Sequence, residues 1–203
     1  MIGTAAPLPP FSLVLDMLAP LTEAALDGIL AEKPQVACFG RYWHTLEAAE
    51  VALIHSRGRS ILPIQYAPSD ELSSQLGTEI ATRLSTKALA LQCPATVASV
   101  IDFENEHGDA ASFGVACATV WSRTGFQPGG YYGAPQSLTA SQLYLLPVWP
   151  YWRGGSVGLQ DPGCGPCLWQ IPPLDKTVAG VRVDHSMSGL DARGRAFTVW
   201  APG

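Results

Sequence analysis

The chain has few basic residues, with 12 Lys and Arg against 17 Asp and Glu in 203 residues and a formal net charge of −5. They are scattered, as at Arg41, Arg57, Arg83 and Arg153, so no basic stripe is present to neutralise phosphates and we expect no nucleic-acid partner. No apolar run approaches the roughly 20 residues that span a membrane. The first residues lack the basic segment of a signal peptide, so we expect export by another route or through a removed leader.

Several catalytic and metal-binding motifs are also missing from the sequence. There is no Gly-x-Ser-x-Gly elbow to supply a serine nucleophile, and no P-loop or dinucleotide fingerprint, so we expect no cofactor. A structural zinc site needs four ligands, and no second Cys or His pair has the required spacing. The five cysteines are an odd number in a chain too large to need disulfides for stability, and Cys38 and Cys117 are expected in the core.

The chain is 47% apolar and long enough to bury one sizeable core, which predicts a single domain over residues 1–203. Short apolar runs alternate with helical patterns in the first two thirds, as in βα units around a parallel sheet. The longest helix is expected from Ser69 to about Leu91, with Asp70 and Glu71 in its first turn, where acids favour the helix dipole. The eight strand candidates are Phe11–Asp16, Gln35–Gly40, Ser60–Gln65, Val97–Glu104, Gly129–Tyr132, Leu145–Trp149, Leu168–Ile171 and Val181–Asp184.

This pattern predicts an α/β fold, a single (β/α)8 barrel of the TIM type. From Leu145 to Pro173 the sequence is dense in Gly, Pro and Trp, so the second half of the barrel is expected to be irregular, with short or missing helices. Such barrels carry their active sites at the C-terminal ends of the strands. An open doubly wound sheet is the alternative, and it would bring the same strand ends to one crevice.

Acidic side chains follow several of the expected strands. Asp102 and Glu104 stand two residues apart behind an apolar strand and so share a face, where their repulsion can raise the pKa of one group and leave the other ionised. Asp16 ends the first strand, Asp184 ends the eighth and Tyr66 follows the third. The alternative for the Asp102 and Glu104 pair is a solvated strand end. The clustering of four acids on one rim favours a functional site.

Aromatic residues fall at or just beyond the same strand ends: Tyr131, Tyr132, Trp149, Tyr151, Trp152 and Trp169. Flat aromatic faces beside carboxylates suit sugar rings, which present apolar C–H faces and hydroxyl groups. At least half of these aromatic residues are nevertheless expected to serve packing.

In order and spacing, these motifs resemble the lysozymes of glycoside hydrolase family 25, and equally a related glycoside-hydrolase-like domain family of unknown function in bacteria and phages. The resemblance runs from about Phe11 to Ser188, which would be the core of the domain. The motifs that carry it are Asp16, Asp102-Phe103-Glu104, Trp149-Pro150-Tyr151-Trp152, Trp169-Gln170 and Val183-Asp184.

The resemblance implies a peptidoglycan hydrolase, a muramidase that cleaves the β-1,4 bond between N-acetylmuramic acid and N-acetylglucosamine. Glu104 would be the general acid and Asp102 would assist attack by the substrate's own acetamido group. The enzyme would act on the bacterial cell wall after secretion or release, and a partner or larger assembly could deliver it. The residues expected to bind substrate are Asp16, Asp184, Tyr66, Tyr132, Trp149 and Trp169.

Two departures from the family pattern leave substrate identity open: Asp16 leads into Met17-Leu18-Ala19-Pro20, and Gln65-Tyr66 replaces the usual end of the third strand. A glycan-binding protein of the same fold without catalysis is therefore an alternative. Cys164-Gly165-Pro166-Cys167 spells a thiol oxidoreductase tetrad, but it leads into a strand instead of a helix. Two unpaired thiols or a loop disulfide are the favoured interpretation there. Among the histidines, His185 beside Asp184 is expected near the site as part of its wall.

Overall fold

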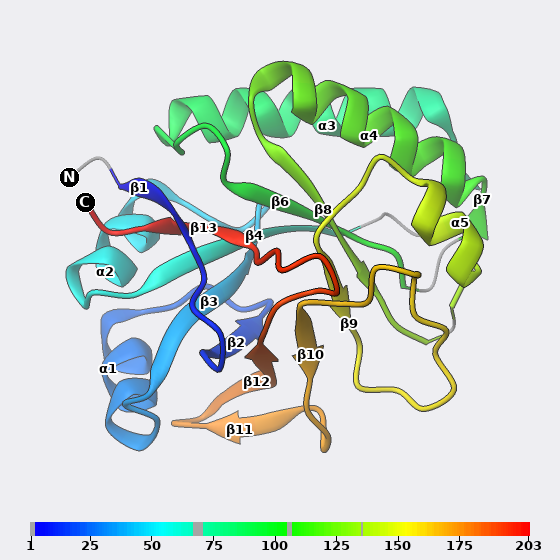
Figure 1. Ribbon diagram of the computed structural model, residues 1–203. Coiled ribbons are helices and arrows are strands. Elements are labelled where there is room, and N and C mark those ends of the chain that lie inside the picture. Colours follow the sequence, from blue (N-terminus) through cyan, green and yellow to red (C-terminus); the bar gives the residue numbers. More distant parts are fainter. Residues whose placement is uncertain (1–2, 67–70, 105–106, 135) are drawn as a thin grey trace.

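The computed structural model describes residues 3–66, 71–104, 107–134 and 136–203. Its centre is a closed barrel of eight strands, which confirms the barrel prediction and excludes the open sheet (Figure 1). The barrel closes because the last strand of the series pairs with the first. In order around the barrel, the strands are β4 (Ser60–Tyr66), β3 (Val36–Tyr42), β2 (Leu13–Met17), β12 (Val181–Ser188), β10 (Leu168–Gln170), β9 (Tyr151–Arg153), β8 (Gln127–Tyr132) and β6 (Ala98–Asp102).

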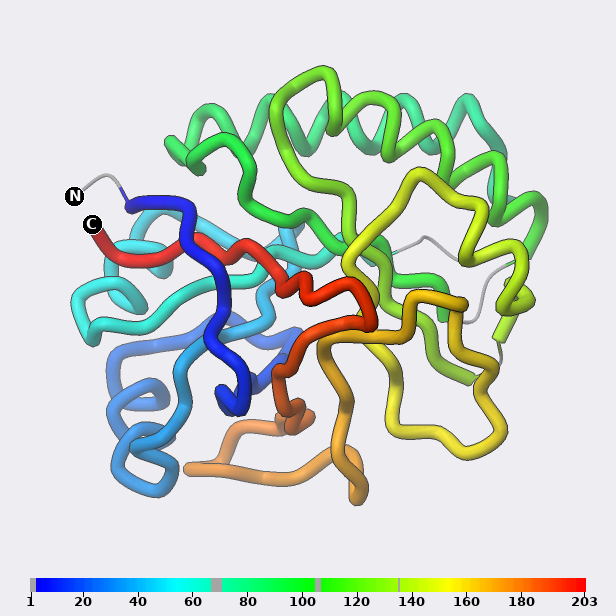
Figure 2. Tube along the Cα trace, in the orientation of Figure 1, coloured from blue at the N-terminus to red at the C-terminus, as the bar shows by residue number. Residues whose placement is uncertain are grey.

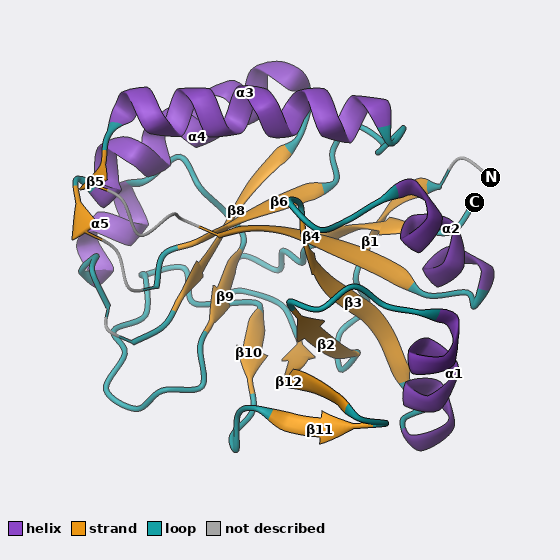
Figure 3. Cartoon of the chain, turned by 180° about the vertical axis from the view of Figure 1, so that it is seen from behind, coloured by secondary structure: helices purple, strands orange, loops and turns teal. Residues whose placement is uncertain are grey.

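Four helices follow the first strands and cover one side of the barrel, with α3 and α4 lying together over β6 and β8 (Figures 1 and 3). Side chains of Thr22, Ser73 and Asp109 cap three of them by accepting a backbone N–H at the N-terminus. The second half of the barrel is irregular, as expected, and its described part holds only a short fifth helix. The helices are α1 (Glu23–Glu32), α2 (Ala48–Ser56), α3 (Ser74–Ala90), α4 (Ala110–Thr124) and α5 (Ala140–Leu145).

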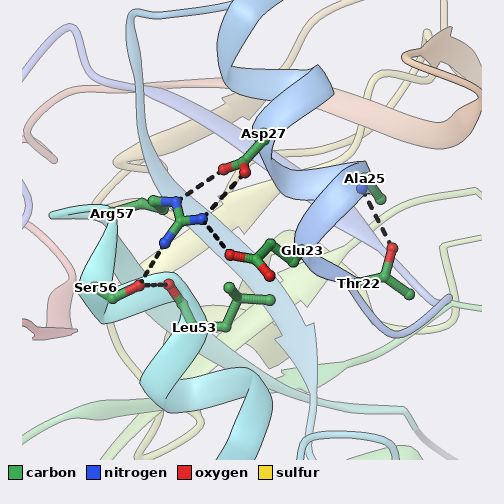
Figure 4. A network of polar contacts seen from close by, with 7 residues as sticks. All are labelled: Thr22, Glu23, Ala25, Asp27, Leu53, Ser56 and Arg57. Carbon is green, nitrogen blue, oxygen red and sulfur yellow. Dashed lines mark hydrogen bonds and ion pairs between the residues drawn. The ribbon is translucent and has the colours of Figure 1, made fainter.

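Helices α1 and α2 are joined at their exposed surface by Arg57 (Figure 4). Its Nε donates to Asp27 Oδ1 at 2.8 Å, and one terminal nitrogen donates to Glu23 Oε1 at 2.8 Å. Because the groups are exposed, this network adds little to the free energy of unfolding.

The eighth strand differs from a regular (β/α)8 barrel, because β12 runs antiparallel to both β2 and β10. The cause lies in the connection: β11 (Lys176–Val178) turns into β12 through Ala179 and Gly180, which both have positive φ. That pair makes a tight hairpin turn, and parallel neighbours would instead need a crossover of a dozen residues or more. Asp184 consequently lies within β12 and not at its end.

Two further boundaries differ from expectation. The sixth strand is β9, because Leu145 closes α5, whose Thr139 and Gln142 form a capping box, and Pro147 and Pro150 follow before the strand begins. The third helix begins at Ser74, because Glu71 belongs to β5 (Glu71–Leu72), which pairs with β7 (His107–Gly108). The expected first-turn residue Asp70 lies outside the described residues.

The barrel interior is apolar at its N-terminal end. Val14, Leu62 and Val100 point inward there and contact Leu8 and Phe197, which lie on the segments that pass beneath the barrel. Those segments carry β1 (Thr4–Pro7) and β13 (Thr198–Ala201), which pair antiparallel and bring the two ends of the chain side by side (Figure 2). A second apolar layer, including Cys117, lies between the barrel and its helices, while Cys38 lies in the interior. The barrel is therefore closed below and open at the C-terminal ends of its parallel strands.

None of the helices in the described ranges is both long and apolar enough to cross a membrane.

Candidate active site

A cavity of about 390 Å³ opens at the C-terminal ends of the parallel strands. Five acids line it, and four of them are those singled out in the sequence: Asp16, Asp102, Glu104 and Asp184. The other lining residues are Tyr42, Ile64, Tyr131, Trp152, Gln170, Leu174, Asp175 and Arg182. The structure thus brings together the four acids that the sequence analysis placed on one rim.

Asp102 and Glu104 face the cavity because the strand alternation continues past the end of β6. Between them, Phe103 points outward and packs under Gly114 of α4, whose lack of a Cβ makes room for the ring. The carboxylate of Asp102 accepts the backbone N–H of Glu104 at 3.0 Å. The two acids are therefore held in fixed relation, although β6 ends at Asp102 and Glu104 forms only an isolated bridge to Gln136.

The Glu104 carboxyl is held against the strand that follows it around the barrel. The Tyr131 hydroxyl donates to Glu104 Oε1 at 2.9 Å and lies 3.1 Å from Gln170 Oε1, while the Ala134 backbone N–H also donates to the carboxylate. Burial raises the pKa of Glu104, and the hydrogen bonds from Tyr131 and Ala134 oppose that rise without cancelling it. A carboxylic acid with a raised pKa keeps its proton to higher pH, as a general acid requires.

Asp16 is buried, with 9% of its surface exposed, as is Asp102 with 4%. Burial raises its pKa well above the usual range, and the charges of Asp184, Asp102 and Glu104 raise it further. Its Oδ2 is buried without a hydrogen-bond partner among the described residues. Gly40 on β3 lies against Asp16, where any Cβ would come within 2.6 Å of the Asp16 Cβ. The Asp16 carboxyl group therefore faces the cavity from β2, and it favours its protonated form.

Asp184 is placed by the hairpin that follows β10. It stands opposite Asp16 in the antiparallel β2–β12 pair. The Asp175 backbone N–H donates to its Oδ1 at 2.6 Å, and Arg182 Nε donates to Asp175 Oδ1 at 2.7 Å. The reversed direction of β12 thus still brings Asp184 to the mouth of the barrel.

A buried ion pair fixes the end of β2 beside Asp16. Arg41 has no exposed surface, and its Nε donates to Glu50 Oε1 at 2.7 Å. A terminal nitrogen of Arg41 donates to the Met17 carbonyl, and Glu50 Oε1 also accepts the Leu21 backbone N–H at 2.9 Å. Arg41 therefore holds the loop at the cavity edge and does not belong to the exposed basic residues.

Replacing Asp16 by asparagine is expected to stabilise the protein at neutral pH. A carboxyl whose folded pKa is raised contributes stability below its unfolded pKa of about 4, and that contribution is lost as pH rises through the folded pKa. Asparagine carries no charge at any pH, so the midpoint of thermal unfolding, Tm, should rise by roughly 2–4 °C at pH 7 for each kcal/mol gained. Near pH 4 the two proteins should unfold at nearly equal Tm.

Asp27→Asn is the matched control, because the hydrogen bond from Arg57 lowers the pKa of Asp27. Its contribution to stability is present above the unfolded pKa and is lost as pH falls, so this variant should lose a little stability at pH 7. Calorimetry from pH 4 to 8 measures both. A Tm gain for Asp16→Asn that does not change with pH would contradict the assignment.

The aromatic residues expected to bind substrate do not line the cavity. Tyr66 stands opposite Asp102 in the β4–β6 pair and is 39% exposed, but it lies outside the cavity wall. The Tyr132 hydroxyl donates to Asp161 at 2.8 Å in the outer layer. Trp149 precedes β9, and the Arg195 guanidinium stacks 4.3 Å from its ring centre. Trp169 is the outward residue of β10 and packs against Gly189.

Their strand neighbours face the cavity instead: Tyr131 in place of Tyr132, Trp152 in place of Trp149, and Gln170 in place of Trp169. The rings of Tyr131 and Trp152 meet edge to face at 5.3 Å, and Trp152 Nε1 donates to Ser186 Oγ at 3.1 Å. Tyr42 joins them because β3 continues two residues past Gly40. Tyr131 and Gln170 each differ by one residue from the expected position, whereas Trp152 lies three residues beyond Trp149, which precedes β9.

The Cys164 and Cys167 thiols are free and buried. The tetrad leads into β10, and burial raises the pKa of Cys167 to about 12. A redox-active thiol needs a lowered pKa at a helix N-terminus, so the thiol oxidoreductase hypothesis lacks its chemical basis here.

His185 points away from the cavity, with its Nε2 buried and without a partner among the described residues. In the same described ranges, no group of three or more His, Cys, Asp and Glu residues is placed to hold a metal ion.

No known protein family model and no curated protein matches this sequence. Solved structures do share its fold. An uncharacterised protein from B. stearothermophilus superposes with a TM-score of 0.72 at 18% identity, over 87% of this chain and 95% of that one. The catalytic domain of endolysin ply40, from bacteriophage P40 of Listeria monocytogenes, superposes with a TM-score of 0.61 at 17% identity, over 88% of this chain and 93% of that one.

The modular autolysin LytC of Streptococcus pneumoniae superposes with a TM-score of 0.64 at 12% identity, over 86% of this chain. The present chain spans 46% of LytC, so it corresponds to less than half of that modular protein. At these identities the likeness concerns the fold. The chain therefore has the barrel fold that is also found in an autolysin and in an endolysin catalytic domain.

Proposed function

We propose that this protein is a glycoside hydrolase that cleaves the β-1,4 bond between N-acetylmuramic acid and N-acetylglucosamine in peptidoglycan. The observation that carries the proposal is the gathering of four acids in one cavity, with the pKa of Glu104 raised by burial. The fold shared with an endolysin catalytic domain and with an autolysin, the latter also solved with a synthetic peptidoglycan ligand, supports it.

In this proposal Glu104 protonates the glycosidic oxygen as the bond breaks. The Tyr131 hydroxyl and the Ala134 backbone N–H fix the carboxyl, so that its proton is presented in one direction. Such positioned general acids contribute roughly 10²- to 10⁴-fold to rates.

The remaining acids act on the other side of the bond. Asp102, held by the Glu104 backbone N–H, orients the acetamido N–H of the substrate, whose carbonyl oxygen attacks the anomeric carbon. No protein nucleophile is then required. Asp16 and Asp184 bind sugar hydroxyls, and the unpartnered Oδ2 of Asp16 supplies a ready hydrogen-bonding position.

The test is to incubate the purified protein with insoluble peptidoglycan from several bacterial sources and to measure turbidity and new reducing ends. Borohydride reduction followed by mass spectrometry of the products should show muramitol at the new ends, because the bond is cleaved after N-acetylmuramic acid. The rate should fall as pH rises through the raised pKa of Glu104, because only the protonated acid can donate.

The same experiment separates the alternatives. Glucosaminitol in place of muramitol would reassign the bond that is cut. Binding of muropeptides with no reducing ends from any source would show a glycan-binding protein without catalysis. Delivery to the cell wall by a partner or a larger assembly remains part of the proposal and would be tested separately, by the location of the protein in cells.

A further inference from the structure

A second cavity of about 560 Å³ continues the first along the rim of the barrel. The two cavities share five lining residues, and the second extends between the loop after β2 and the β11–β12 hairpin. The residues that line only the second cavity are Met17, Leu18, Ala19, Gly180, Val181 and Val183. The cleft is therefore long enough to continue a glycan chain beyond the sugar that meets Glu104.

The six residues that line only the second cavity have no polar or charged side chain, whereas Asp16, Asp175 and Asp184 line both cavities. Leu18 is 60% exposed at its edge, and Val181 and Val183 lie on the opposite side. Apolar side chains of this kind can receive the C–H face of a pyranose ring. Neutral packing alone would not discriminate between one glycan and another, because most sugar rings offer such a face.

Arg182 supplies the discriminating charge. Of the described residues that line either cavity, it is the one with a cationic side chain, and it borders both cavities. The side chain is 74% exposed, and its Nε is held by Asp175 Oδ1 at 2.7 Å. The terminal nitrogens have no hydrogen bond to another described residue. The guanidinium is thus oriented by Asp175 while its outer edge stays available.

We propose that Arg182 binds a carboxylate carried on the sugar in the second cavity, so that the cleft selects anionic amino-sugar glycans over neutral ones. This inference rests on the proposed function and names its substrate class. In peptidoglycan the lactyl group of muramic acid, or the peptide attached to it, carries such a carboxylate, whereas chitin has none. A guanidinium fork binds a carboxylate through paired hydrogen bonds, which a single ammonium cannot reproduce.

Charge balance makes this contact necessary for an anionic ligand. Asp16, Asp175 and Asp184 line both cavities, whereas Asp102 and Glu104 line the first alone. Those acids that are ionised would repel an anionic chain unless a cation met its charge. Because Arg182 borders both cavities, its positive charge can offset this repulsion and favour the binding of an anionic glycan.

The experiment measures binding by calorimetry of two tetrasaccharides of equal length on a Glu104→Gln background, which prevents turnover. One ligand is the neutral N-acetylglucosamine tetramer and the other is the alternating tetramer with free lactyl carboxylates. Arg182→Gln should weaken the anionic ligand about tenfold, which corresponds to about 1.4 kcal/mol, and should leave the neutral ligand unchanged. Arg182→Lys should recover only part of the loss, and added salt should weaken the anionic ligand alone.

Arg57→Gln is the matched control, because it removes one exposed arginine of the α1–α2 surface and makes the same change in net charge. It should affect neither ligand. Equal weakening of both ligands by Arg182→Gln, or weakening of neither, would overturn the inference even if the native protein hydrolyses peptidoglycan. Selective binding of the anionic ligand without hydrolysis by the native protein would instead refute the proposed activity and leave the role of Arg182 standing.

Discussion

Replacing Glu104 by glutamine is expected to lower the rate of reducing-end release from peptidoglycan by roughly 10²- to 10⁴-fold, because a glutamine amide cannot supply the proton that a general acid donates. The fold should persist, since the glutamine Oε1 can still accept the hydrogen bond from the Tyr131 hydroxyl. Removing a partly buried carboxyl with a raised pKa also relieves a desolvation cost. The measurement is the initial rate of reducing-end release at saturating substrate, with circular dichroism to verify folding.

Glu47→Gln is the control, because Glu47 is 72% exposed on its side chain and pairs with Lys87 at the surface. This variant should keep the native rate. If the Glu104→Gln protein retained more than about a tenth of the native rate, Glu104 would not be the general acid, since the loss would fall below what such acids contribute.

The acids of the site could be predicted from the sequence because each follows a short, mostly apolar run of residues. The C-terminal ends of parallel strands meet at one mouth of a barrel, so a carboxylate at such an end is expected to lie at that mouth. The alternation rule also placed Asp102 and Glu104 on one face, and the outward packing of Phe103 under α4 shows why it held. Asp184 reached the same mouth by an antiparallel strand, which the sequence analysis did not foresee.

The aromatic wall could not be predicted to the residue, because facing direction changes with every residue of a strand. Asp102 faces the cavity and pairs with Tyr131, so the β6–β8 register decides that Tyr131, and not Tyr132, meets Glu104. That register is a long-range property, which a local pattern does not contain. For β9, the two prolines after α5 moved the strand beyond Trp149 and brought Trp152 inward. Where two aromatic residues are adjacent in the sequence, the local pattern predicts that an aromatic side chain lines the cavity. The strand register decides which of the two does so.

The position of Glu104 depends on a residue that the sequence analysis did not single out. Gly133, just beyond β8, lies directly against the Glu104 side chain: a Cβ at this position would overlap Oε1 and Cδ and would come within 2.6 Å of Cγ. At the nearby Gly154, an added Cβ would come within 2.8 Å of the Tyr131 hydroxyl and 2.9 Å of the Gly133 Cα. These glycines leave the space in which Glu104 and Tyr131 meet. Gly133 is therefore a positioning residue for the proposed general acid.

Gly133→Ala is accordingly expected to lower kcat about 100-fold, a loss typical of a catalytic group moved by about 1 Å. The added methyl group pushes the Glu104 carboxyl away and breaks its hydrogen bond with the Tyr131 hydroxyl. KM should change less than kcat, because sugar contacts along the rest of the cleft remain. Tm should fall only slightly, because the flexible Glu104 side chain can move out of the way. Steady-state kinetics and thermal unfolding measure these effects.

A double-mutant comparison shows whether the loss passes through Glu104. On the Glu104→Gln background, Gly133→Ala should cause almost no further loss of rate, because the group that it displaces no longer acts. Gly163→Ala is the control glycine: its nearest neighbour would be Tyr144 Cδ2 at 3.3 Å, and Gly163 does not line the acidic cavity, so the native rate should persist. Additive losses in the double mutant would mean that Gly133 supports the site by some route other than Glu104, and Gly133 would then not be a positioning residue for that carboxyl.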